Sequence, residues 1–314
     1  MRYRLEDISS KSYEHPADRA ATAALQSIPV LNTAVRKLIE LQYERALRQV
    51  YLASAVKVGE DQLPHVWEQY RAALDVLDLP LVYDLYVVQN PFVNAAAIGS
   101  EKPIIVVNSS LVGLLEPDEL KTILSHEFGH ILSDHMLYRT ALLILLQLSL
   151  PRLPFVAGLP LFALRAALLE WSRAAELTCD RAATLANRDP LVTARTLMTV
   201  SSGMRSSKLS LDAFLRQANE YHEWDSKFDR AQRFFIELGL THDFAVRRVN
   251  ELMKWVRAGE YDRIIGGDYV KRGDKVDPRA AADDAVKHYR ERFSSIVDEA
   301  SKTGGRFADW LRGG

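Results

Sequence analysis

The stretch Ser125-His126-Glu127-Phe128-Gly129-His130 contains the pattern H-E-x-x-H, in which two histidines lie four residues apart. On an α-helix this spacing places His126 and His130 on one face, about 40° apart. Two imidazole nitrogens in that arrangement can bind one zinc ion, and Glu127 can reach a water on the metal without binding the metal itself. The stretch therefore predicts a helix that carries part of a catalytic zinc site.

The residues around the motif favour this helix. Pro117-Asp118-Glu119-Leu120 has the composition of a helix start, and apolar residues then recur at helical spacing, at positions 120, 123, 124, 128 and 131. Gly129 lowers the helix propensity by about 1 kcal/mol relative to alanine. We expect so small a residue to let another segment approach the metal closely.

A catalytic zinc site needs a third protein ligand, and His135 is a poor candidate for it. It follows His130 by five residues, about 140° further around the helix, so it cannot join the histidine pair if the helix continues. The metzincin pattern would need a ligand at 136 and a glycine at 133, where this chain has Met136 and Ser133.

Glu176 is the better candidate for the third ligand. The stretch 170–183 predicts a second helix, on which Glu176 and Asp180 share one face because they lie four residues apart. Zinc-binding histidines usually donate their other N–H group to a nearby carboxylate, and Asp180 can accept it. The alternative is that both carboxylates are ordinary charges on a helix surface.

These motifs resemble those of the gluzincin zinc metallopeptidases of the HtpX-like and CAAX-prenyl-protease type, in a soluble bacterial branch. The resemblance is strongest over roughly residues 80–190. It implies a zinc-dependent endopeptidase with one Zn²⁺ per chain, and we expect a role in protein quality control. The matching segments are His126-Glu127-x-x-His130, Glu176-x-x-x-Asp180, Asn108-Ser109-x-Leu111, Asp118-Glu119-Leu120, Trp171-Ser172-Arg173 and Asp180-Arg181-Ala182.

The resemblance also draws attention to His242 and Arg248 as catalytic candidates. The family has a His-Pro pair at this place, with an arginine six residues after the histidine, whereas this chain has Asp243 in place of the proline. Three roles for His242 stay open. It can donate a hydrogen bond to the tetrahedral oxyanion, occupy the fourth zinc position in a latent state, or only cap a helix together with Asp243.

The fold expected is α+β and predominantly helical, with a zincin-type H-E-x-x-H helix and a glutamate-bearing helix under a small antiparallel-containing sheet. Strands are predicted at 82–88, 93–98 and 103–108. The family resemblance makes the middle strand a sheet edge beside the zinc, where Asn94, Ala95 and Ala96 can pair with an extended substrate. The alternative is a tightly packed strand without a substrate role.

Length and composition favour an ordinary globular protein. The chain has 314 residues, of which 48% are hydrophobic and 26% charged, and its net charge of −1 gives no indication of nucleic-acid binding. We expect an N-terminal helical segment at 1–80, a zinc metallopeptidase core at 81–200 and a C-terminal helical region at 201–314. The last region is predicted to contain helices at 210–221, 226–238 and 280–300, a loop at 259–272 and a short apolar tail at 307–311.

The N-terminus has no apolar segment of the kind found in signal peptides, so a cytoplasmic protein is expected, with or without association with a membrane. Residues 141–169 are very apolar, but prolines, a glycine and an arginine interrupt them. Buried core helices are therefore favoured over a membrane-contacting hairpin or true spans. Peripheral membrane contact through 141–169 or the C-terminal helix stays open, as does the oligomeric state.

The remaining alternatives concern the single cysteine and the activity. Cys179 excludes a disulfide within the chain, and a buried apolar role is favoured over contact with the metal. Besides a protease that acts on polypeptides, the chain could be a non-catalytic zinc scaffold with a chaperone-like role, or a membrane-docking protein. Glu127 argues against the scaffold, because a structural zinc ion does not need it. The interrupted apolar run argues against docking.

Overall fold

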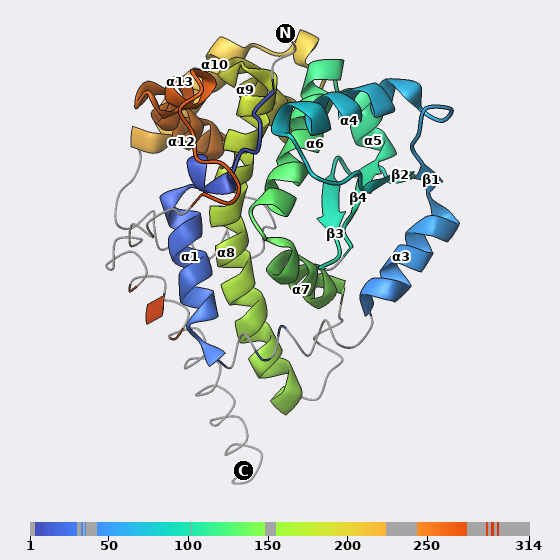
Figure 1. Ribbon diagram of the computed structural model, residues 1–314. Helices are drawn as coiled ribbons and strands as arrows, with labels where there is room; N and C mark the ends of the chain where they lie inside the picture. The colour runs from blue at the N-terminus through green and yellow to red at the C-terminus, as the bar shows by residue number, and fades with distance from the viewer. Residues whose placement is uncertain are drawn as a thin grey trace.

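The fold is predominantly helical with one small mixed sheet, as the sequence predicts (Figure 1). The computed structural model describes residues 4–29, 33, 35, 43–100, 102–147, 155–223, 244–274, 287, 290, 291 and 294. The side chains of 43, 44, 47, 155–163, 222 and 223 are outside this description.

The sheet has four strands in the order β1-β2-β4-β3, so that β3 is an edge strand. The parallel pair is β2 with β4, while β1 pairs antiparallel with β2 and β3 pairs antiparallel with β4. The predictions for the last three strands are confirmed to within two residues. The strands are β1 (Val56–Lys57), β2 (Asp84–Val88), β3 (Ala95–Ile98) and β4 (Ile104–Asn108).

Two helices, α6 (Pro117–Leu132) and α8 (Phe155–Asn187), pack side by side at the centre of the molecule (Figure 1). Pro117 opens α6, where the Glu116 N–H donates a hydrogen bond to the Glu119 carboxylate over 3.0 Å. The two helices are in close contact at Gly129, where an added Cβ atom would lie 3.0 Å from the Cα atom of Cys179. The glycine therefore permits the close approach that its size predicts.

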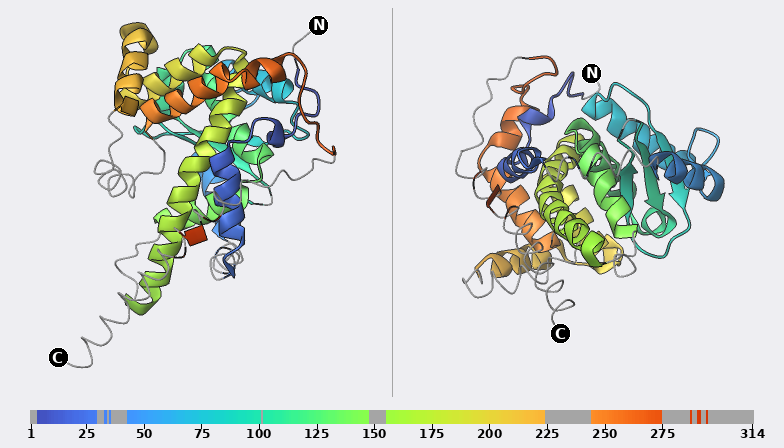
Figure 2. Two further views of the ribbon diagram at one scale, coloured as in Figure 1. Left: turned by 90° about the vertical axis from the view of Figure 1, so that its left-hand side faces the viewer. Right: turned by 90° about the horizontal axis from the view of Figure 1, so that it is seen from below.

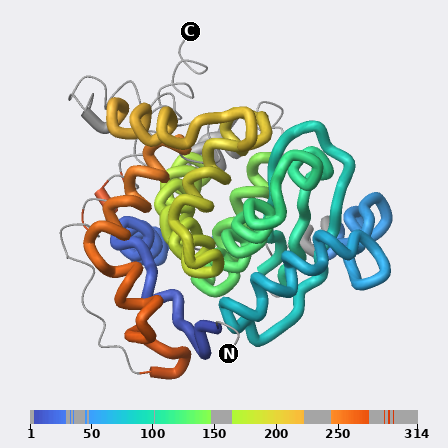
Figure 3. Tube along the Cα trace, turned by 90° about the horizontal axis from the view of Figure 1, so that it is seen from above, coloured from blue at the N-terminus to red at the C-terminus, as the bar shows by residue number. Residues whose placement is uncertain are grey.

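The other helices surround this pair. The helix α1 (Pro16–Gln26) runs along α8 on the side away from the sheet (Figure 2). Seen from above, α12 and α13 also lie on the side of α8 that is away from the sheet (Figure 3). The remaining bounds are α3 (Tyr43–Ser54), α4 (Pro64–Leu77), α5 (Ser109–Leu114), α7 (Met136–Gln147), α9 (Pro190–Ser202), α10 (Leu211–Glu223), α12 (Ala245–Arg257) and α13 (Glu260–Ile265), with short 3₁₀ turns η1 (Ser10–Ser12) and η3 (Ser206–Lys208).

The prediction of a loop over 259–272 is wrong in its first half, because Glu260–Ile265 forms α13. Gly259, with φ 79°, ends α12 and lets the chain turn directly into the next helix. The predicted helix at 226–238 and the tail at 307–311 lie outside the described residues, as does most of 280–300.

The largest hydrophobic core joins elements that are distant in sequence. It contains side chains from α4, β2, α6, α8 and α12, among them Leu77, Leu85, Phe128, Ala182 and Leu252. A second cluster joins α1, α7 and α8, and in it Ala141, Leu142, Ile144 and Leu145 are buried. Most described side chains of 141–147 and 164–169 thus pack inside the protein.

Across the described residues, no helix combines the length and the hydrophobicity needed to cross a membrane.

Candidate active site

The structure brings the three predicted metal ligands together between α6 and α8. His126 Nε2 lies 3.4 Å from Glu176 Oε2, and His130 Nε2 lies 3.3 Å from Glu176 Oε1. All three side chains are buried. One carboxylate therefore faces both histidine nitrogens, and the donors converge from two helices that Gly129 allows to come close.

The other ring nitrogen of each histidine, Nδ1, contacts a partner of its own. His126 Nδ1 lies 3.1 Å from Asp180 Oδ1, and His130 Nδ1 lies 3.1 Å from His135 Nδ1. Such partners fix the orientation of an imidazole and leave the opposite nitrogen for a metal. The ring orientations therefore agree with metal binding through both Nε2 atoms.

The charges around the pair act on the two histidines in opposite directions. Burial lowers the pKa of His126, but the neighbouring carboxylates of Glu176 and Asp180 outweigh this and raise its pKa to about 9. Burial and the positive charge of Arg139 hold the pKa of His130 well below its ordinary value. In this arrangement His130 is neutral, as a metal ligand must be.

Arg248 comes to the site from α12. Its guanidinium donates two hydrogen bonds to Asp180, over 2.6 and 2.8 Å, and lies 3.1 Å from Glu176 Oε2. Burial raises the pKa of Asp180, but Arg248 more than offsets this and holds the pKa below its ordinary value. Arg248 thus lies against the carboxylates of α8, whereas His242 is outside the described residues.

His135 lies near the metal ligands because α6 does not continue to it. The helix ends at Leu132, Asp134 adopts a left-handed conformation with φ 56°, and the His135 N–H donates to the carbonyl oxygen of His130 over 3.0 Å. This turn returns the His135 ring to His130 Nδ1. Sequence reasoning excluded His135 as a ligand on the condition that the helix continues, and had no signal for its role as a hydrogen-bond partner.

Glu127 lies between the metal ligands and the edge strand β3. Its Oε2 atom accepts a hydrogen bond of 2.6 Å from the Ala97 N–H. The Asn108 N–H donates to the carbonyl oxygen of Asn94 over 3.0 Å, and antiparallel ladders alternate, so Asn94 and Ala96 direct their main-chain groups toward β4. The outward main-chain groups at this edge are therefore those of Ala95 and Ala97.

Sequence reasoning missed Arg139, which lies on α7 and joins several parts of the site. It donates to Glu127 Oε2 over 3.0 Å, to His130 Nε2 over 2.7 Å and to the Ala97 carbonyl oxygen over 3.3 Å. A signal was present in the sequence, because Arg139 is the sole charged residue of 136–147. A lone charge in a buried apolar helix usually has a partner.

A second possible donor set includes the cysteine. Ligand atoms of His126, His130 and Cys179 lie within 4.8 Å of one another. Burial raises the pKa of the Cys179 thiol well above its ordinary value, which disfavours the thiolate that binds metals. Imidazole with carboxylate or thiolate suits zinc better than magnesium or calcium in either set.

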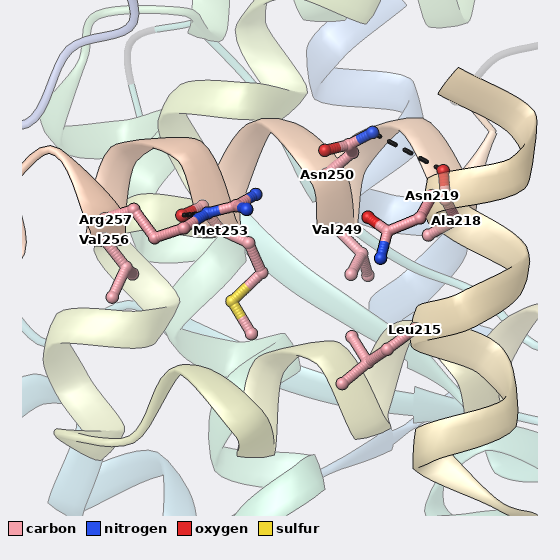
Figure 4. Close-up of a pocket in the computed structure, with 8 residues that line it drawn as sticks. All are labelled: Leu215, Ala218, Asn219, Val249, Asn250, Met253, Val256 and Arg257. Carbon is pink, nitrogen blue, oxygen red and sulfur yellow. Dashed lines mark hydrogen bonds between the residues drawn. The ribbon is translucent and has the colours of Figure 1, made fainter. Parts of the chain in front are cut away.

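A separate surface pocket lies between α10 and α12 and contains none of the predicted metal ligands (Figure 4). It is mostly apolar, and Asn250 Nδ2 donates a hydrogen bond to the Ala218 carbonyl oxygen over 3.4 Å. The lining residues are Leu215, Ala218, Asn219, Val249, Asn250, Met253, Val256 and Arg257.

Comparison with known proteins adds a family to this geometry. A sequence model described as Peptidase family M48 matches residues 59–256. The chain is also 34% identical over 268 residues to the plastoglobule-localized metallopeptidase 48 of Arabidopsis thaliana chloroplasts, an alignment that covers 83% of this chain and 76% of that protein. No solved structure matches. The family match includes the site residues on α6, α7, α8 and α12 but begins after α1.

Proposed function

The chain belongs to peptidase family M48 and is a metallopeptidase, and on this premise we propose that it cleaves extended polypeptides with one zinc ion held by His126, His130 and Glu176. Asp180 orients His126, and Glu127 is the general base. A non-catalytic scaffold and a membrane-docking protein are not favoured by the family membership.

The observation that carries this proposal is the position of Glu127. The metal-facing nitrogens of both histidines lie against Glu176, whereas Glu127 accepts a hydrogen bond from the edge strand at Ala97. A general base can take the proton of the attacking water only if it lies between the metal and the peptide bond to be cleaved. Glu127 has that position if the substrate lies along β3.

Zinc at these donors would polarise the scissile carbonyl and lower the pKa of a water toward 7. Glu127 accepts the proton of the attacking water and passes it to the leaving amine. The Ala97 N–H and Arg139 hold its carboxylate in place through bonds of 2.6 and 3.0 Å. The outward main-chain groups of Ala95 offer pairing to an extended substrate, whereas those of Ala97 already bind Glu127 and Arg139.

Main-chain pairing places few demands on substrate side chains, which supports unfolded polypeptide as the substrate class and protein quality control as the role. We include a cytoplasmic or other reducing location in the proposal, because the single cysteine, Cys179, is buried and free. The division into an N-terminal segment at 1–80, a core at 81–200 and a C-terminal region at 201–314 stays a prediction.

The test compares Glu127→Gln with wild type and with Glu68→Gln, which makes the same change at an exposed position of α4. Wild type and Glu68→Gln should contain about one zinc per chain and cleave unfolded casein. Glu127→Gln should hold as much zinc and lose cleavage. The proposal fails if the zinc-loaded wild type leaves casein and other unfolded proteins intact, or if Glu127→Gln cleaves at the wild-type rate.

A further inference from the structure

A chain of buried side chains connects the N-terminal helix α1 to His130. His135 Nδ1 lies 3.1 Å from His130 Nδ1, and on the other side of the ring His135 Nε2 lies 3.0 Å from Asp18 Oδ2. The three residues are between 0 and 2% exposed. Asp18 is thus two hydrogen bonds from a proposed metal ligand, although it precedes residues 59–256, which the family model matches.

The direction of each hydrogen bond in this chain follows from Arg139. Its guanidinium carries N–H groups and no acceptor, so His130 Nε2, at 2.7 Å from it, must accept. A neutral imidazole that accepts at Nε2 carries its proton on Nδ1, and His130 therefore donates to His135 Nδ1. His135 must then carry its own proton on Nε2, where it donates to the Asp18 carboxylate.

Asp18 is held rigidly as an acceptor. The hydroxyl of Thr178 on α8 donates to Asp18 Oδ2 over 2.5 Å, and the hydroxyl of Thr22 donates to Oδ1 over 3.3 Å. The His15 N–H in turn donates to the Thr178 oxygen over 3.0 Å. The two hydroxyls donate to the carboxylate, and the His15 N–H donates to the hydroxyl oxygen of Thr178. Asp18 is thus surrounded by donors, and toward His135 it acts as the acceptor.

We propose that Asp18 is a positioning residue of the metal site. It fixes His135 as the Nε2–H tautomer, and His135 fixes His130 as the Nδ1–H tautomer, which leaves the lone pair of His130 Nε2 directed at the metal. The helix α1 is therefore part of the active site as well as a packing partner of α8. The effect on metal affinity rests on the proposed function, while the tautomers are a property of the chain alone.

The tautomers can be measured without metal by ¹⁵N NMR of the imidazole rings in the full chain. Wild type should show His130 protonated at Nδ1 and His135 at Nε2. Asp18→Asn should add a population of His135 with the proton on Nδ1. Glu14→Gln, which removes a nearby carboxylate paired with Arg19, should leave both rings unchanged. Wild-type His135 protonated at Nδ1, or at both nitrogens, would overturn the proposal, and this measurement needs no variant to fold.

Zinc affinity, measured by competition with a chelator, tests the consequence. Asp18→Asn should weaken binding about tenfold, the lower end of the 10–100-fold range for partners of metal-bound histidines. In a His135→Phe background the same substitution should have no further effect, because the connection is already broken. The proposal is wrong if Asp18→Asn leaves the zinc affinity unchanged, or if it lowers the affinity equally in the wild-type and His135→Phe backgrounds. Asp18 would then have a role in packing alone. If zinc does not bind at all, the proposed function fails, while the measured tautomers still decide whether Asp18 orients His135 and His130.

Discussion

Replacing Gly129 by alanine should lower both the stability of the protein and its affinity for zinc, although alanine is the better helix former. The new Cβ atom would lie 3.0 Å from the Cα atom of Cys179 and 3.1 Å from the Cβ atom of Ala182. Both atoms are close to or part of the backbone of α8, which cannot swing aside as a long side chain can. The helices α6 and α8 must therefore move apart by a few tenths of an ångström.

Two opposing terms give the magnitude. Alanine should gain about 1 kcal/mol of helix propensity, whereas forcing a methyl group into a packed interface costs typically 1–3 kcal/mol. The expected loss of stability is about 0–2 kcal/mol, with a shift in Tm of roughly 2–4 °C for each kcal/mol. Because Glu176 moves with α8 and the histidines with α6, zinc affinity should also fall, on the order of tenfold.

The matched control is Gly113→Ala on α5, where an added Cβ atom has no atom within 4 Å. The same substitution should there raise stability by about 0.5–1 kcal/mol and leave zinc affinity unchanged. Denaturant unfolding and chelator competition measure the two quantities. Gly129→Ala with wild-type stability and wild-type zinc affinity would refute the idea that this contact sets the distance between the ligands.

Three further predictions concern individual side chains of the site. Asp180→Asn should weaken zinc binding about 10–100-fold, measured by chelator competition; wild-type affinity would remove Asp180 from the site. Glu176→Gln should lower the zinc content of the purified protein far more than Glu127→Gln, and equal losses in metal analysis would contradict the two roles. Arg139→Met should tighten zinc binding by about 10- to 150-fold, because a charged hydrogen bond worth about 1.5–3 kcal/mol no longer competes for His130. It should also lower the thermal stability of the metal-free protein; weaker zinc binding would show that Arg139 supports the metal.

The sequence predicts the parts of the site that depend on local patterns. Helical periodicity and a proline at the helix start identify α6, and the four-residue spacing places Glu176 and Asp180 on one face of α8. The turn residues near Asn90 and Gly99 delimit the edge strand. These features depend on neighbours within a few positions, which is the range over which sequence patterns carry structural information.

The parts that could not be predicted depend on contacts between distant elements. His135 becomes a partner of His130 because Asp134, which is not a glycine, takes a left-handed conformation. The partners of Arg139 lie on α6 and β3, and no spacing along α7 reveals them. Asp18 has the position of an ordinary acidic residue in the first turn of a helix, and its role follows only from the packing of α1 on α8.

The buried charges of the site show why a divalent cation fits it. In the described part of the chain, the site contains four buried carboxylates and two buried guanidiniums. The carboxylates are those of Asp18, Glu127, Glu176 and Asp180, and the guanidiniums are those of Arg139 and Arg248. With neutral histidines the site has a net charge of −2, and uncompensated buried charge costs several kcal/mol. A pKa of about 9 lets His126 take up a proton and offset half of it. A divalent ion would supply both charges, but it needs a neutral His126 and the Nε2 atom of His130 that Arg139 now contacts. Metal binding by the proposed ligands would therefore be an exchange, in which a proton leaves His126 and the Arg139 guanidinium leaves His130.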